Sequence, residues 1–378
     1  MAKLPLLTIS TVAMLHMLSG SASAGVTDIS AQSSTTCAVV DGAAWCWGWS
    51  GPFALLGNQV ENTSSARPLK VKGLENVSAI SVGGHVCAIA GGAVWCWGDN
   101  RWGELGIGTR KTALSPTLVK GLPAPVTAIS AGQFHTCAIA AGDVWCWGHG
   151  VYGQLGNGQR RDVAHPVRVS GLGGGASAIA TSSQASCAIT AGVVKCWGLN
   201  TQSVLGSFKK ADSAVPVEIA DVKDATAISC GYAKCCAISA GSVKCWGDMG
   251  SVADPSAPPV SVARTVDGIS NASALAVDNH VCAIADRRLI CWGDNQYGQT
   301  GSHSPSGSSF AVRRPTKVKG LVGVTHVAIG LSHTCAIADR KAYCWGNYFE
   351  GDLGTGKQGD GRMFDPSLNE TEPQPVKW

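Results

Sequence analysis

The sequence predicts an all-β protein, a seven-bladed β-propeller, and two observations carry this prediction. Two cysteines stand nine residues apart at seven places along the chain, and successive pairs start 46 to 53 residues apart. Each copy also holds four short segments of strand character separated by glycine-rich turns, which is typical of a propeller blade. A fixed period of this length indicates a repeat architecture. The seven pairs are Cys37/Cys46, Cys87/Cys96, Cys137/Cys146, Cys187/Cys196, Cys236/Cys245, Cys282/Cys291 and Cys335/Cys344.

Each cysteine pair is expected to bracket a tight β-hairpin. In the second copy Gly91-Gly92 forms the turn, because two-residue hairpin turns need positive φ angles. Counting outward from this turn places Ile89 opposite Val94 and Cys87 opposite Cys96. Cysteines in a pair without ladder hydrogen bonds have Cα atoms about 4.5 Å apart, within disulfide range. We therefore predict one cross-strand disulfide in each blade, each worth roughly 2–3 kcal/mol of stability.

Side-chain alternation along the third copy predicts how neighbouring blades pack. Cys137 and Ile139 fall on one face of the hairpin, whereas Ala138 and Trp147 fall on the other. A large ring beside a small alanine is suited to packing against the next sheet. We therefore expect the repeated tryptophan to lie between blades. It recurs as Trp47, Trp97, Trp147, Trp197, Trp246, Trp292 and Trp345.

The two ends of the chain predict how the ring closes. The segment Val26–Ser30 matches the second strand of a unit, whereas Pro375–Trp378 matches a first strand such as Pro166–Val169. A strand that combines proline with basic residues is typical of the outermost edge of a sheet. We therefore predict that the C-terminal strand pairs into the N-terminal blade and closes the ring.

The first 24 residues are expected to be a secretory signal peptide. Lys3 provides the positive start, an apolar stretch follows, and Ala22-Ser23-Ala24 fits cleavage after small residues. The predicted organisation is a signal peptide over 1–24 and one propeller domain over 25–378. Secretion into an oxidising compartment agrees with sixteen cysteines. Cys230 and Cys235 lie outside the pattern and are interpreted as one more local disulfide, with a reactive thiol pair as the alternative.

Composition and motifs exclude several functions. A net charge of +4 over 378 residues is nearly balanced, so neither nucleic acid nor a membrane is expected as a partner. Hydrolase and phosphate-loop motifs do not occur, so we expect no enzyme activity, no catalytic residues, no cofactor and no metal site. A monomer is expected. Asn62 and Asn369, which lie farther from predicted strands than the other sequons, are predicted as glycosylation sites in a host that glycosylates.

The histidines are expected to have a structural role. Four of them stand two residues before a hairpin cysteine, and a position repeated in several blades is typical of structural hydrogen bonding. They are His85, His135, His280 and His333.

The run from Cys87 to Gly106 contains Val94-Trp95-Cys96-Trp97-Gly98-Asp99-Asn100, and close copies recur from Cys137 and Cys282. This pattern resembles the regulator of chromosome condensation repeat over essentially the whole mature chain. The resemblance implies a seven-bladed propeller. It is specific for fold and much less so for function, because relatives include a nuclear exchange factor, the secreted β-lactamase-inhibitor protein II and plant receptor ectodomains.

The loops that follow each Trp-Gly are the predicted binding face. Aromatic anchors with polar neighbours are typical of binding hot spots. The alternative is that these rings pack beneath their loops, because part of the pattern repeats. The candidate partner-binding residues are Trp49, Phe53, Trp102, Tyr152, Tyr297, Tyr348 and Phe349.

The leading functional interpretation is a secreted, non-catalytic propeller that binds an extracellular protein of unknown identity through one loop face. One alternative is an inhibitor of a secreted hydrolase such as a β-lactamase. Another is a glycan-binding propeller. A guanine nucleotide exchange factor fits less well, because that activity is intracellular and this chain begins with a signal-like segment.

Overall fold

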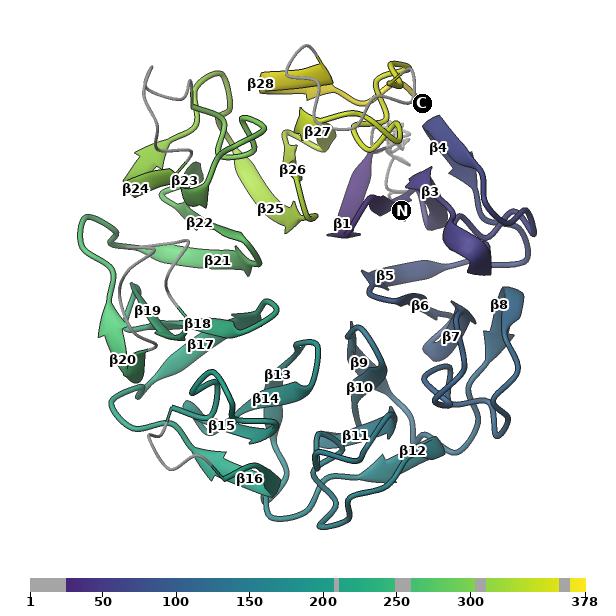
Figure 1. The fold of residues 1–378 in the computed structure, drawn as a ribbon, viewed down its shortest axis with the longest axis vertical. Coiled ribbons are helices and arrows are strands. Elements are labelled where there is room, and N and C mark those ends of the chain that lie inside the picture. Colours follow the sequence, from purple (N-terminus) through teal and green to yellow (C-terminus); the bar gives the residue numbers. More distant parts are fainter. Residues whose placement is uncertain (1–24, 207–210, 249–259, 303–310, 360–367) are drawn as a thin grey trace, which may run out of the picture.

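The computed structural model describes residues 25–206, 211–248, 260–302, 311–359 and 368–378. In these residues, twenty-eight strands form seven four-stranded antiparallel sheets arranged as a ring (Figure 1). This confirms the predicted seven-bladed propeller. The segment 1–24, predicted as a signal peptide, lies outside the described residues. No helix within the described part of the chain is long and apolar enough to cross a membrane.

Each blade is formed by four strands that are consecutive in sequence. Blade 1 comprises β1 (Val26–Gln32), β2 (Thr35–Val40), β3 (Ala43–Trp49) and β4 (Ser64–Lys70), with a short 3-10 helix at Gly51–Phe53 before β4. Blade 2 comprises β5 (Val77–Val82), β6 (His85–Ala90), β7 (Ala93–Gly98) and β8 (Ala113–Leu118). Blade 3 comprises β9 (Val126–Ala131), β10 (His135–Ala140), β11 (Asp143–Gly148) and β12 (Val163–Arg168). Blade 4 comprises β13 (Ala176–Thr181), β14 (Ala185–Thr190), β15 (Val193–Gly198) and β16 (Ser213–Glu218).

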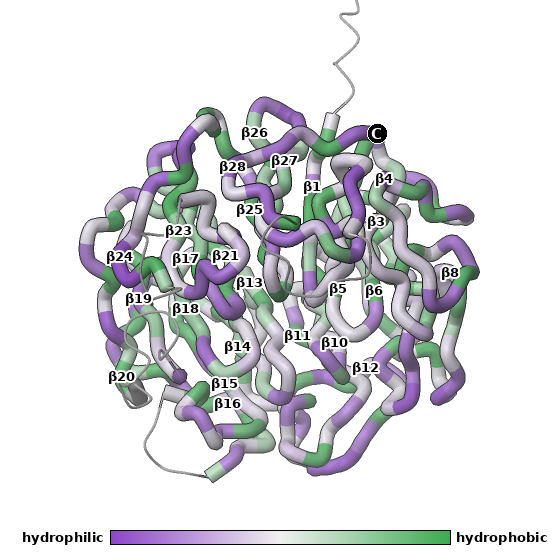
Figure 2. The backbone as a smooth tube through the Cα atoms, turned by 45° about the horizontal axis from the view of Figure 1, so that its top comes forward, coloured by the Kyte–Doolittle hydropathy of each residue, from purple (hydrophilic) through white to green (hydrophobic). Residues whose placement is uncertain are grey.

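The remaining three blades repeat this order, with the first strand innermost and the fourth at the periphery (Figure 1). Blade 5 comprises β17 (Ala225–Cys230), β18 (Lys234–Ser239), β19 (Ser242–Gly247) and β20 (Val260–Thr265). Blade 6 comprises β21 (Ala272–Val277), β22 (His280–Ala285), β23 (Arg288–Asp294) and β24 (Ala311–Lys317). Blade 7 comprises β25 (Val324–Ile329), β26 (His333–Ala338), β27 (Lys341–Asn347) and β28 (Asn369–Pro375). Hydrophilic residues lie mainly in the peripheral loops (Figure 2).

The predicted hairpin register is confirmed. Cys87 pairs with Cys96 and Ile89 with Val94 across the Gly91-Gly92 turn, whose φ angles are +58° and +76°. The Cα atoms of Cys87 and Cys96 are 4.1 Å apart. This separation is close to the 4.5 Å expected for a pair without ladder hydrogen bonds, so the turn chemistry places the two sulfurs within bonding distance.

The predicted disulfide is confirmed in every blade. It joins the second strand of the blade to the third, whose cysteine also pairs with a residue of the outermost strand, as Cys46 does with Leu69 and Cys146 with Val167. The seven disulfides, in blade order, are Cys37–Cys46, Cys87–Cys96, Cys137–Cys146, Cys187–Cys196, Cys236–Cys245, Cys282–Cys291 and Cys335–Cys344.

Blade 5 carries an additional disulfide between Cys230 and Cys235, which makes eight in the described residues. No cysteine of the described residues is free, so the alternative of Cys230 and Cys235 as a reactive pair of free thiols is wrong. Eight disulfides indicate an oxidising environment.

The predicted ring closure is wrong. β28 pairs with β27 in blade 7, with Cys344 opposite Gln374, and β1 pairs with β2 in blade 1. The proline-containing strand therefore ends the blade of the preceding hairpin and does not begin the next one. The period of a repeat does not show which of its strands comes first in a blade, so the predicted blade boundaries are displaced by one strand. The observed arrangement pairs strands that are consecutive in sequence, which is the commoner arrangement. Blade 1 is complete without the C-terminus.

Packing between blades closes the ring instead. The buried core at the junction of the first and last blades joins Val26 and Trp47 to Cys335 and Val376. The backbone N–H of Val26 donates to the carbonyl of Arg340 at 2.9 Å. The Trp378 ring lies edge-on to the rings of Trp45 and Trp47, at 6.0 and 5.8 Å between centroids. The C-terminus thus contacts blade 1 through side chains, without adding a strand to it.

A hydrogen-bond network of histidine, hydroxyl and tryptophan side chains recurs at several junctions between neighbouring blades. It confirms the structural role predicted for the histidines. Between blades 2 and 3, His85 lies 2.5 Å from the Thr136 hydroxyl, which donates to the Glu104 carbonyl at 2.8 Å. The Trp147 indole donates to the same carbonyl at 2.9 Å. The hydroxyl proton is engaged with the carbonyl, so His85 Nε2 donates to the hydroxyl. His135 with Ser186, His280 with Thr334, and His333 with Thr36 repeat this contact.

Candidate functional site

The loops predicted to bind lie on one face of the ring. In an antiparallel blade, the connection between strands one and two and the connection between strands three and four emerge at the same edge. The Trp-Gly loops therefore share a face with loops such as 132–134 and 182–184. We call this the loop face. The hairpin turns and the blade-to-blade connectors occupy the opposite face.

The structure brings two of the predicted aromatic residues together on the loop face. The ring of His149, in blade 3, lies 4.8 Å from the Trp102 ring of blade 2 and 5.7 Å from the Tyr152 ring. The Phe134 ring completes the group at 6.1 Å from His149. We call Trp102, Phe134, His149 and Tyr152 the aromatic cluster. Trp102 is 37% exposed, whereas His149 is buried beneath it.

Local backbone geometry explains why His149 reaches Phe134. Gly148 ends β11 with φ +103°, and a Cβ atom there would lie 2.7 Å from the Phe134 carbonyl oxygen. Glycine therefore permits the turn that lets the His149 N–H donate to that carbonyl at 2.9 Å. The Gln154 amide then donates to His149 Nδ1 at 2.8 Å, which fixes the ring orientation. Burial lowers the pKa of His149, so the neutral ring is favoured.

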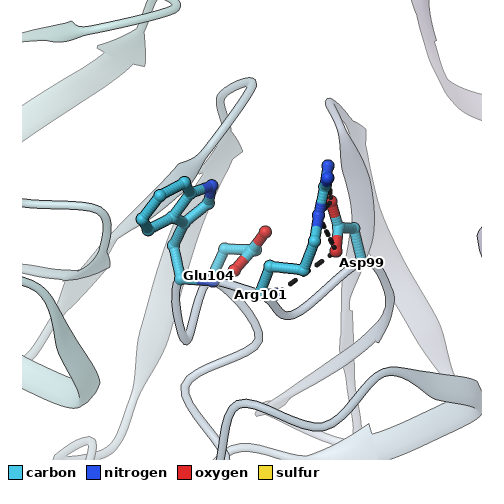
Figure 3. Close-up of polar contacts among 4 residues, drawn as sticks. Asp99, Arg101 and Glu104 are labelled. Carbon is cyan, nitrogen blue, oxygen red and sulfur yellow. Dashed lines mark hydrogen bonds and ion pairs between the residues drawn. The ribbon is translucent and has the colours of Figure 1, made fainter.

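An arginine extends the aromatic cluster toward blade 1. The Arg101 guanidinium lies 5.2 Å from the centre of the Phe53 ring, an arrangement typical of a cation–π contact. Asp99 holds Arg101 through a bidentate ion pair, with nitrogen–oxygen distances of 2.7 to 3.0 Å (Figure 3). Asp99 is buried while the Arg101 side chain is 62% exposed. Positive charge is therefore what this pair presents to solvent.

Glu104 lies beside this ion pair (Figure 3) and differs from its counterparts in blades 3 and 6. Gln154 and Gln299 occupy its position in blades 3 and 6, where each amide donates a hydrogen bond, to His149 and to Asp294 respectively. Glu104 Oε2 accepts the Trp102 N–H at 2.7 Å, but Oε1 is buried with no partner among the described residues. Burial, aided by the charge of Asp99, raises the pKa of Glu104 to about 7.

Replacing Glu104 by glutamine is expected to stabilise the protein above pH 7. A pKa raised from 4.5 to about 7 means that the stability from neutral Glu104 is complete below pH 4.5. It is lost, by about 1.4 kcal/mol per pH unit, as the pH rises toward 7. Glu104→Gln removes that loss and restores the donor. Urea unfolding should show a variant about 1–3 kcal/mol more stable at pH 8, converging on the wild type near pH 4.5.

Gln154→Glu is the matched control, since it places a carboxyl at the same position of blade 3 and should destabilise that blade at pH 8. A pH-independent difference between wild type and Glu104→Gln would contradict a titrating Glu104.

The other predicted aromatics lie elsewhere. Trp49, 41% exposed, ends β3 in blade 1. Tyr297 is half-buried in blade 6, and Tyr348 and Phe349 are half-buried in blade 7. Lys357 lies 5.8 Å from the centre of the Tyr348 ring. The seven predicted residues therefore do not form one continuous patch, and only Trp102 and Tyr152 share the cluster, with Phe53 next to it through Arg101.

Sequence reasoning missed His149, Phe134, Glu104 and Arg101. A signal for His149 was present: it follows Trp147-Gly148 where blades 2 and 6 have Asp99 and Asp294. A residue that departs from the repeat in one blade is therefore a candidate for a role specific to that blade.

The two predicted glycosylation sites occupy different settings. Asn62 is exposed in the loop before β4. Asn369 is the first residue of β28, and its side-chain oxygen accepts a hydrogen bond from Asn347 at 3.2 Å. The expectation that Asn369 lies away from the strands is therefore wrong, whereas its glycosylation stays a prediction.

The fold defines a class of protein: a disulfide-bonded β-propeller built from repeated four-stranded blades. The family model "Regulator of chromosome condensation (RCC1) repeat" matches residues 91–139, 141–189 and 286–337, and a second model of that repeat matches 126–154. The chain therefore carries RCC1 repeats over these residues.

Solved structures agree on the fold. Human WBSCR16 superposes with a TM-score of 0.75 at 19% identity, covering 89% of this chain and 95% of that one. Prp20p from Saccharomyces cerevisiae, whose structure was described with its binding properties to Gsp1p and histones, superposes with a TM-score of 0.74 at 21% identity. That alignment covers 88% of this chain and 85% of Prp20p. The chain thus has an RCC1-like propeller fold.

Proposed function

We propose that this protein is secreted and binds an extracellular protein through the loop face, with the aromatic cluster at the centre of the contact. The observation that carries the proposal is the packing of Trp102 and Tyr152 against His149, which joins two blades in one surface. Eight disulfides suit the extracellular setting. The role is non-catalytic: the cluster supplies contact area and hydrogen-bonding groups to a partner.

The chemistry of the cluster supports a protein-binding hot spot. Tryptophan, tyrosine and arginine are the residue types that dominate binding energy at interfaces, where they form a central group shielded from water. Trp102 stands on the buried His149, so little side-chain freedom remains to be lost on binding. Arg101, held by Asp99, adds a fixed cation at the edge. The partner surface that fits is apolar at its centre, with an acceptor facing Arg101.

Removing the exposed Trp102 ring and the half-buried Tyr152 ring is expected to abolish partner capture. We would immobilise the mature protein and its Trp102→Ala/Tyr152→Ala variant, expose both to extracellular fluid, and identify retained proteins by mass spectrometry. Hot-spot truncations cost about 2 kcal/mol or more each, which is roughly 30-fold in Kd. A specific partner should be retained by the wild type and lost from the double variant.

Tyr297→Ala is the matched control, because Tyr297 occupies the same loop position in blade 6 outside the cluster. It should retain the partner. Equal retention by all three proteins would place the binding surface elsewhere, and capture of glycan alone would overturn the proposal of a protein partner.

A further inference from the structure

Two disulfides lie in contact at the junction of blades 4 and 5. Cys187, disulfide-bonded to Cys196 in blade 4, has its sulfur 3.7 Å from the Cys230 sulfur and 3.8 Å from the Cys235 sulfur of blade 5. These separations are van der Waals contacts between sulfurs. The three sulfurs Cys187, Cys230 and Cys235 lie within 4.8 Å of one another. We call Cys187, Cys196, Cys230 and Cys235 the sulfur cluster.

The sulfur cluster replaces the hydrogen-bond network found at four other blade junctions. Ala185 stands where blades 2, 3, 6 and 7 carry the structural histidine, and Cys235 stands where blades 1, 3, 4 and 7 carry the partner hydroxyl. Among the described residues of this junction, the histidine-to-hydroxyl contact is therefore absent. Disulfides, which can exchange partners, therefore stand at this junction in place of hydrogen bonds between side chains.

One member of the sulfur cluster is reachable from outside. Cys187, Cys196 and Cys235 are buried, whereas Cys230 is partly exposed at the end of the innermost strand β17. Cys230 lines a small pocket of about 50 Å³ on the loop face, together with Gln32, Ser182 and Tyr232. Tyr232 is 75% exposed at its rim. A thiolate from solvent thus meets the Cys230 sulfur before any other sulfur of the cluster.

From this arrangement we propose that the sulfur cluster is a thiol–disulfide exchange site, which moves a disulfide from within a blade to a position between blades 4 and 5. An external thiolate attacks Cys230, forms a mixed disulfide with it, and releases the Cys235 thiolate. The Cys235 thiolate then attacks the adjacent Cys187 sulfur, forming Cys187–Cys235 and releasing the Cys196 thiolate, which takes up a proton. One external thiol is consumed and one Cys196 thiol is produced, so the number of disulfides is conserved.

A dithiol reductant completes the reaction by reduction. Its second thiol displaces Cys230, so that the reductant leaves as a cyclic disulfide and the protein retains Cys187–Cys235 with thiols at Cys230 and Cys196. Two electrons and two protons pass to the protein. Cys230 lies as close to Cys187 as Cys235 does, so attack from Cys230 gives the alternative product Cys187–Cys230. Either product covalently joins β14 to the β17–β18 pair.

Limited reduction of the folded wild-type protein with dithiothreitol tests the proposal. After alkylation, trypsin separates the four cysteines, because Lys195 lies between Cys187 and Cys196 and Lys234 lies between Cys230 and Cys235. We expect the Cys187 peptide to be linked to the Cys230 peptide, or to the Cys235 peptide, which also carries Cys236 and its disulfide to Cys245. Alkylation of Cys196 should exceed that of Cys344, the matching residue of blade 7, by about tenfold, because the attacking thiolate is already in contact with its target. Opening of Cys230–Cys235 without a linked peptide would overturn the proposal.

Two variants test the exchange without any reductant. Cys230→Ser leaves a thiol at Cys235, which should form Cys187–Cys235 in part of the molecules and make Cys196 reactive toward iodoacetamide. Cys230→Ser/Cys235→Ser is the matched control, in which Cys187–Cys196 stays intact and unlabelled. An unlabelled Cys196 in the single variant, with Cys235 alone modified, would contradict the exchange. These readouts are independent of partner binding.

Discussion

Replacing Trp147 by alanine is expected to lower the free energy of unfolding by about 3–5 kcal/mol. The ring is fully buried in a core that joins Cys87, Ile89 and Leu105 of blade 2 to blade 3. Alanine would leave a cavity in the core between the two blades. It would also remove the indole donor to the Glu104 carbonyl. Urea unfolding, with disulfides kept oxidised, measures the loss.

Two further variants separate the causes. Trp147→Phe keeps much of the ring but removes the donor, and should cost about 1–3 kcal/mol. Trp49→Ala removes an exposed tryptophan of blade 1 and should cost less than about 1 kcal/mol. If Trp147→Ala were as mild as Trp49→Ala, the repeated tryptophans would not hold the blades together.

Features set by short stretches of sequence could be predicted. The hairpin register follows from turn chemistry at Gly91-Gly92, and the side-chain alternation around Cys137 follows from the pleat. Both act over a few residues, and the structure confirms both. The structural histidines could also be predicted, because four copies of the same position are independent observations of one role.

Features that depend on how copies meet could not be predicted. The length of a repeat does not show at which strand a blade begins, so the sequence alone assigns β28 to the wrong blade. The aromatic cluster joins a residue of blade 2, Trp102, to three of blade 3, and Phe134 belongs to a different loop from Tyr152. The sulfur cluster likewise joins Cys187 to Cys230 and Cys235 across a blade junction. A single copy contains no information about these contacts.

Acidification is expected to unfold the propeller through its four structural histidines. Burial lowers the pKa of His135 and His280 to about 3, and of His85 and His333 to about 4, from an ordinary 6.5. Their folded-state pKa values lie below the unfolded value, so the unfolded chain takes up protons first. The stability they contribute is complete above pH 6.5. It is lost as the pH falls toward 4 and 3.

The expected loss is large because the four positions act together. Each buried neutral histidine lowers the stability by about 1.4 kcal/mol per pH unit, so the four together lower it by about 5.5 kcal/mol per unit between about pH 6 and pH 4. Below pH 4 only His135 and His280 continue to do so. Glu104 acts in the opposite direction between pH 7 and 4.5. Buried Asp28, Asp278 and Asp352, whose pKa values are also raised, oppose the loss down to about pH 3.8. Net destabilisation should therefore steepen below about pH 4.

Substituting one histidine isolates its contribution to the pH-dependent loss of stability. His135→Gln retains a side-chain donor for the Ser186 hydroxyl and removes the titration, so its stability should fall more slowly with acidification than that of the wild type. The wild type's advantage in free energy of unfolding over His135→Gln should shrink by about 1.4 kcal/mol per pH unit below pH 6, and then change sign. Urea midpoints measured from pH 7 to pH 3.5 report this slope, and parallel curves would contradict a buried neutral His135.

Because His333 makes the same contact to Thr36 across the ring-closing junction, His333→Gln should flatten the curve in the same way. The ring then closes by the same hydrogen bond that joins several of its other blades, and acid should open that junction together with the rest.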